Sequence, residues 1–138
     1  MSTATKARQE ALDAVRERLR PREEVVAVLP FASTPKRKIG PDGLKVRDGV
    51  YQSYRRYRPI VVTDRRLFVL DGGRTPHPRR GVLAEYPLEQ VDVVDVIAKR
   101  FNQNRVVLDL PDEGAVPFDV GGYEVDDLAV LRARLERR

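Results

Sequence analysis

The sequence predicts a mainly β (α+β) domain, in which about seven short antiparallel strands form a small sandwich or barrel with a helix at each end of the chain. Three observations predict this class. Helical spacing of apolar residues is confined to the two ends, apolar runs of strand length fill the middle, and turn residues separate those runs. With 138 residues, the chain has the usual length of one domain, so we expect a single domain over 1–138.

An N-terminal helix is expected over about 3–20. Leu12, Val15 and Leu19 repeat at helical spacing, alanines extend the same stripe, and Pro21 ends it. Because the stripe is narrow and rich in alanine, we expect this helix to pack lightly on the main body.

The β core is expected over about 24–120, and its first half begins with the apolar run 25–31. Pro59 interrupts a later stretch, which indicates an edge strand or a bulge. The apolar segments 60–62 and 67–70 flank a short polar segment, and this pattern predicts a tight hairpin.

The second half of the core contains the apolar run 91–97. Its alternation slips one register after Val93, which on a strand indicates a bulge or burial on both faces. The last two strands, 106–110 and 116–120, alternate cleanly, and Pro117 predicts that the final one lies at a sheet edge.

A closing helix is expected over about 123–137. Val125, Leu128, Leu131 and Leu135 form its apolar stripe, which we expect to be buried. Acidic residues stand in its first turn and arginines in its last turns, the polarity that the helix macrodipole favours.

Two short motifs add to this order of elements. Residues 60–70 read IVVTDRRLFVL, and residues 86–91 read YPLEQV. The first resembles the hairpin of bacterial pleckstrin-homology (PH) and GRAM-like domains, which has an apolar strand, a Thr-Asp/Asn-x-Arg turn and a second apolar strand. The second is similar to the I-P-x-x-x-I step by which such domains enter a middle strand, and the closing helix also matches.

The resemblance covers most of the chain from about Glu24 onward. It implies a scaffold with strand-connecting loops at one open end and a helix that plugs the other end. Members of this family bind lipid head groups, peptides or other proteins, so the fold alone does not give the function.

Catalytic, metal-binding and cofactor-binding motifs are absent from the sequence. The chain has no cysteine, and its one histidine, His77, stands between two prolines with no carboxylate near it in sequence. Asp92 and Asp95 lie three residues apart, which places them on opposite faces of a strand unless the bulge intervenes. We therefore expect neither an enzyme nor a bound cofactor.

The chain also lacks the signals that would direct it into or across a membrane. No apolar run approaches the ~18 residues of a transmembrane span, and the N-terminus has no apolar signal region. We expect a cytoplasmic protein.

Charge is distributed unevenly along the chain. Residues 36–80 hold 13 Lys and Arg against four Asp, whereas residues 81–138 hold seven basic against twelve acidic residues. Such asymmetry predicts a bipolar surface that attracts anionic partners. Our candidates for binding an anionic ligand are Lys36, Arg37, Lys38, Lys45, Arg47, Arg55, Arg56, Arg58, Arg65 and Arg66.

Several of these residues fall in a polar loop expected over 33–49, where prolines and glycines disfavour regular structure. The spacing of Lys36, Lys45 and Arg47 is similar to the K-x(n)-K-x-R pattern of lipid-binding members of the resembled family. The alternative is a solvated basic loop without a dedicated ligand.

The segment 51–58, YQSYRRYR, interleaves tyrosines with arginines, as single-stranded nucleic-acid binders do. Alternate residues of a strand face opposite sides, so the three tyrosines do not form one platform. The pattern therefore also suits tyrosines that pack at a sheet rim beneath arginine side chains.

We expect a non-enzymatic binding or recruitment module. The first expectation is a protein partner or self-association, with docking on an exposed sheet edge such as the strand of Pro117 or the one beginning at Tyr57. The alternative is peripheral binding of anionic lipid head groups at the inner face of the membrane. Nucleic-acid binding is the least favoured of the three.

Overall fold

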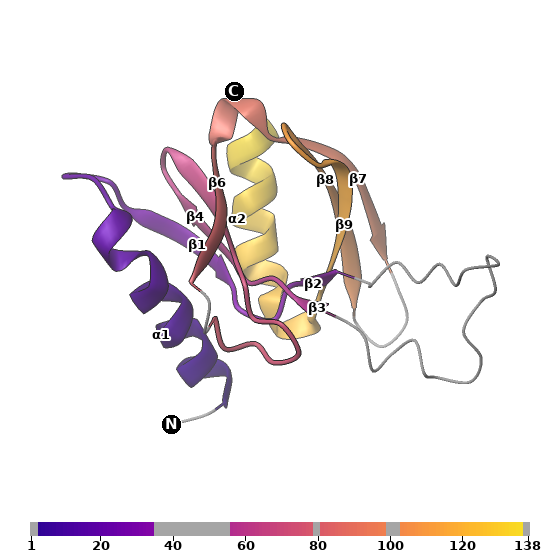
Figure 1. The fold of residues 1–138 in the computed structure, drawn as a ribbon. Coiled ribbons are helices and arrows are strands. Elements are labelled where there is room, and N and C mark those ends of the chain that lie inside the picture. The colour runs from indigo at the N-terminus through magenta and orange to yellow at the C-terminus, as the bar shows by residue number, and fades with distance from the viewer. Residues whose placement is uncertain (1–2, 35–55, 79–80, 99–102, 137–138) are drawn as a thin grey trace, which may run out of the picture.

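Two antiparallel sheets and two α-helices make up the computed structural model, which describes residues 3–34, 56–78, 81–98 and 103–136 (Figure 1). The expected mainly β (α+β) class is confirmed. In chain order, with η for a 3-10 helix, the elements are α1 (Thr3–Val15), η1 (Arg16–Arg18), β1 (Val25–Leu29), β2 (Ser33–Thr34), β3 (Arg56–Tyr57), β4 (Ile60–Thr63), β5 (Arg66–Leu70), β6 (Val82–Pro87), η3 (Leu88–Gln90), β7 (Asp92–Ala98), β8 (Asn104–Leu110), β9 (Gly114–Val120), η4 (Gly122–Glu124) and α2 (Val125–Glu136).

Two stretches of chain pass from one sheet to the other. The first sheet has the strand order β1-β4-β5-β6 and the second has β3-β2-β9-β8-β7. Leu29 pairs with Ile60 in the first sheet, and Ser33 pairs with Tyr57 in the second. Proline, which lacks an amide donor, stands in each connection, at residues 30 and 59. Each long stretch is thereby divided into two strands, so nine strands are described where about seven were expected.

Several predictions of local structure are confirmed. β4 and β5 form the expected hairpin, with Ile60 paired to Val69. The register of β7 against β8 shifts between Val93 and Asp95, where the alternation predicted a bulge. The first two residues of the loop expected over 33–49 form β2 instead, and the rest of that segment lies outside the described residues.

The two strands proposed from the sequence as sheet edges lie at different positions in the second sheet. β9, which carries Pro117, lies between β2 and β8, so the prediction that it is an edge strand is wrong. The Tyr57 amide of β3 donates to the Gly73 carbonyl at 2.7 Å, and its carbonyl accepts from the Gly72 amide at 3.0 Å. β3 is the outermost strand of the second sheet, and the outward backbone groups of its Tyr57 are bonded to the segment after β5.

The main core lies between the two sheets and contains one face of α2 (Figure 1). Leu128, Leu131 and Leu135 are buried there, as the stripe predicted. Val125 is 45% exposed, so its predicted burial is wrong; it is the first residue of the helix, before the buried stripe begins.

A buried carboxylate fastens the start of α2 to the bend between β1 and β2. Glu124 accepts the Phe31 amide at 2.9 Å and the Gly121 amide at 3.0 Å. Its side chain is withdrawn from water, and this burial raises the pKa of Glu124.

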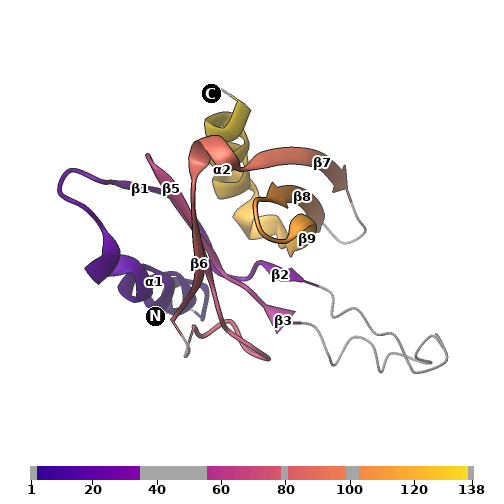
Figure 2. The same ribbon diagram turned by 45° about the horizontal axis from the view of Figure 1, so that its top comes forward.

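α1 packs on the outer face of the first sheet, on the side away from the second sheet (Figure 2). Ala7, Ala11 and Val15 are fully buried, and Val15 belongs to a smaller core together with Phe68. The helix expected over 3–20 ends at Val15 and continues as the 3-10 turn η1. Alanines in the contact allow α1 to approach the sheet closely.

We predict that Leu131→Ala lowers the free energy of unfolding by about 2–5 kcal/mol, because it leaves a cavity in the main core. Val130→Ala, at the adjacent and partly exposed position, is the matched control and should change stability by at most about 0.5 kcal/mol. Urea unfolding measures both variants, and equal losses would contradict the placement of α2.

Candidate functional site

The structure describes four of the ten residues predicted to bind an anionic ligand. These four, Arg56, Arg58, Arg65 and Arg66, come from β3, β5 and the turns beside them. The other six lie outside the described residues: Lys36, Arg37, Lys38, Lys45, Arg47 and Arg55.

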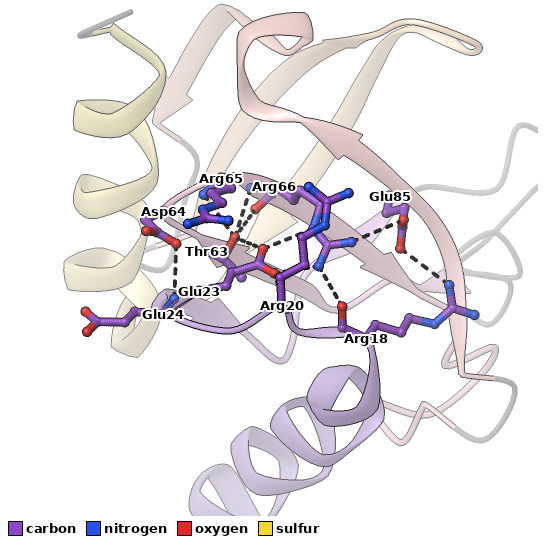
Figure 3. Close-up of polar contacts among 9 residues, drawn as sticks. All are labelled: Arg18, Arg20, Glu23, Glu24, Thr63, Asp64, Arg65, Arg66 and Glu85. Carbon is purple, nitrogen blue, oxygen red and sulfur yellow. Dashed lines mark hydrogen bonds and ion pairs between the residues drawn. The ribbon is translucent and has the colours of Figure 1, made fainter.

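Arg66 is engaged inside the protein (Figure 3). Its Nε and Nη2 donate to the Glu23 carboxylate at 3.0 and 2.5 Å, and Nη2 also donates to the Arg18 carbonyl at 2.7 Å. Nη1 reaches Glu85 at 3.3 Å, and the guanidinium lies 4.8 Å from the centre of the Phe68 ring. With a side chain only 9% exposed, Arg66 has its donors directed at internal acceptors rather than at solvent.

Glu23, whose side chain is fully buried, collects two further hydrogen bonds. Thr63 Oγ1 donates to it at 2.6 Å and the Arg20 amide at 2.9 Å. The bond from Arg66 is the largest cause of a pKa lowered to about 2, and it outweighs burial, which acts in the opposite direction. Thr63 Oγ1 also accepts the amides of Arg65 and Arg66, so the Thr-Asp-Arg-Arg turn has a structural role.

Two of the other described candidates also form ion pairs. Arg56 contacts Asp71, which is buried, at 2.9 Å, and Arg58 contacts Glu113 at 3.3 Å. Arg65 is exposed and is the one of the four whose guanidinium meets no carboxylate within the described part of the chain. The four described candidates thus do not assemble a cluster of free cations.

His77 contacts a carboxylate that sequence proximity could not reveal. Its Nδ1 lies against Glu10 Oε2 of α1, 67 residues away in the chain. The pair borders a shallow cavity between α1 and the segment after β5. In the described part of the chain, no three His, Asp or Glu side chains are close enough together to hold a metal ion.

Exposed apolar side chains lie on the outer face of the second sheet. Val94, at the bulge of β7, is 58% exposed and Ile97 is 43% exposed. Asp95 lies opposite Val107 of β8, which lies opposite Pro117 of β9, so these side chains share one face. Neither described helix covers this face, because α1 lies on the first sheet and α2 in the main core.

Carboxylates border these apolar residues. Asp92 and Asp109 are directly opposite each other in the register and both are exposed, and the bulge brings Asp95 to the same face. At the other end, Arg105 forms a two-bond ion pair with Asp119, at 2.8 and 3.1 Å, which neutralises both charges. We define the outer-face strip as Asp92, Val94, Asp95, Ile97, Val107, Asp109 and Pro117.

The sequence already indicated part of this strip, because the alternation of apolar residues in 91–97 slips after Val93. A bulge places two consecutive residues, Val94 and Asp95, opposite the single residue Val107. Asp92 and Asp95 were expected on opposite faces unless a bulge lay between them, and the bulge does put both on one face. Which face is uncovered could not be read from the sequence, because it depends on where α1 packs.

The fold and this strip define a small mainly β domain with an exposed, acid-bordered apolar face. Comparison with known proteins finds no family model and no curated protein that matches the chain. Within the described residues, neither helix has the length and apolarity needed to cross a membrane.

We predict that stability falls as the pH drops from about 4.5 toward 2. The pKa of Glu23 is lowered in the folded protein from its ordinary value of 4.5, so protonation opposes folding across that range. Glu23→Gln should remove this loss and cost about 3–5 kcal/mol at neutral pH, because it breaks a buried pair. Urea unfolding as a function of pH measures both effects.

Glu24→Gln is the matched control, because the Glu24 side chain is exposed. It should keep the acid dependence of the native protein. The same dependence in Glu23→Gln would contradict the assignment.

Proposed function

We propose that this protein is a non-enzymatic binding module of PH-like fold and that its partner is another protein, which docks on the outer-face strip. The observation that carries the proposal is the exposure of Val94 and Ile97 on a sheet face that neither described helix covers. Uncovered apolar side chains rimmed by polar residues are typical of protein interaction sites.

The PH-like part of the proposal is supported by the order of the elements. A strand pair that bends from one sheet into the other, the hairpin of 60–70 and the closing helix α2 all agree with the resemblance. The loops of such a scaffold and the outer face of its second sheet are separate surfaces. Fold alone does not choose between them, so the argument for the strip rests on its side chains.

The charges of the described residues favour a protein over an anionic membrane. Arg56, Arg58 and Arg66 already bind carboxylates, and a phosphate would have to displace these partners. The strip itself carries exposed carboxylates, which repel lipid phosphates and nucleic-acid backbones alike. We place this recruitment function in the cytoplasm, in agreement with a chain that has no cysteine.

We predict that a photo-crosslinking residue at Ile97 forms a specific protein adduct in lysate of the native host. The same residue at Leu83 of β6, which is 44% exposed, is the matched control and should form none. Addition of unlabelled native protein should compete the adduct away. Equal, non-competed labelling at both positions, or no adduct at Ile97, would refute docking at this face.

Vesicle co-sedimentation tests the lipid alternative. We predict that the protein stays in the supernatant with both phosphatidylcholine vesicles and phosphatidylserine-containing vesicles at low salt. Pelleting with the anionic vesicles that salt or Arg65→Glu abolishes would overturn the preference for a protein partner.

A further inference from the structure

The edge of β7 bears on how a partner can dock. β7 pairs with β8 on one side and is the last strand of its sheet, so no other described strand pairs with its other side. Such an edge could accept an added strand, which is one recurring way for a sheet to bind an extended peptide.

Two features of this edge oppose strand addition. The bulge at Val94 interrupts the regular spacing of donors and acceptors in the middle of the strand. The Asp95 carboxylate accepts the amide of Val96 at 2.8 Å, so that donor is already bonded. A bulge and a charged side chain are the means by which natural edge strands avoid pairing.

The side chains of the face point to the charge of its partner. Asp95 and Asp109 are exposed carboxylates on the face that also carries the exposed Val94 and Ile97. A cation brought against these carboxylates is attracted, whereas an anion is repelled.

We infer that the partner of the outer-face strip is a protein segment with apolar residues flanked by lysine or arginine, held by side-chain contacts on the sheet face and not as an added strand. The inference rests on the proposed function and specifies its partner. Val94 and Ile97 supply the apolar contact, and Asp95 and Asp109 select for positive charge.

Two synthetic peptides of equal length test the charge selection, one alternating lysine with leucine and the other alternating glutamate with leucine. We expect the lysine peptide to shift the backbone NMR signals of β7 and β8 and the glutamate peptide to leave them unchanged. Binding of the lysine peptide should weaken as salt is raised. Equal binding of both peptides, or lysine-peptide binding confined to other surfaces, would overturn the inference.

Variants of the acidic residues give the quantitative test. Asp95→Asn and Asp109→Asn should each weaken the lysine peptide by about two- to fivefold, the range of exposed ion pairs. Asp126→Asn, an exposed position on α2, is the matched control and should leave the affinity unchanged. If Asp126→Asn weakens binding as much as the strip variants, the effect comes from net charge and the strip is not selective.

The melting temperature tests whether Asp109 has a structural role instead of a binding role. Because Asp109 is exposed, Asp109→Asn should leave the melting temperature unchanged while its binding weakens. Loss of stability in parallel with loss of binding would assign Asp109 to the fold instead.

Hydrogen exchange distinguishes face docking from strand addition. An added strand would form new hydrogen bonds and slow exchange of the edge amides of β7, whereas docking on the face should leave their rates unchanged. If the lysine peptide slows them, the face-docking inference is wrong. If the Ile97 crosslink forms but the lysine peptide does not bind, the partner chemistry is wrong and the proposed function stands.

Discussion

Glu23 and Arg66 form the buried ion pair on which the first sheet and its helix depend. The contact joins the linker after α1 to the hairpin of β4 and β5, and Arg66 extends it to Glu85 of β6 and to the carbonyl of Arg18. Charges this far from water are tolerated because both carboxylate oxygens of Glu23 and all three guanidinium nitrogens of Arg66 find partners. The same pair removes a cation from the surface, so it shapes both the packing of α1 and the chemistry that the protein can offer to a ligand.

The two sheets differ in whether a described helix covers their outer face. Alanines of α1 allow it to cover the first sheet closely, and Phe68 is thereby fully buried. The second sheet keeps a bulged edge strand, opposed carboxylates and exposed apolar residues on its outer face. Their combination on one face is the physical basis for the proposal that this face binds a partner.

Sequence periodicity predicted the elements that are long and amphipathic. Both helices, the β4–β5 hairpin and the bulge after Val93 are where the spacing of apolar residues placed them. The edge assignment of Pro117 failed because β2 has two residues, too few to show any period, and yet it pairs with β9. The sequence predicts Arg66 as a ligand-binding cation because its partner, Glu23, is 43 residues away and no local pattern links the two.

The bends at residues 30 and 59 also determine how the protein can come apart. Each bend joins a strand of the first sheet to a strand of the second, so both sheets draw on the same two stretches of chain. α2, the last element, fills the space between the sheets and is tied back to Phe31 at the first bend. A cut between β6 and β7 would therefore leave one fragment with an unfilled core and the other with a sheet lacking two strands. The domain should melt in a single transition, and neither fragment should fold without the other.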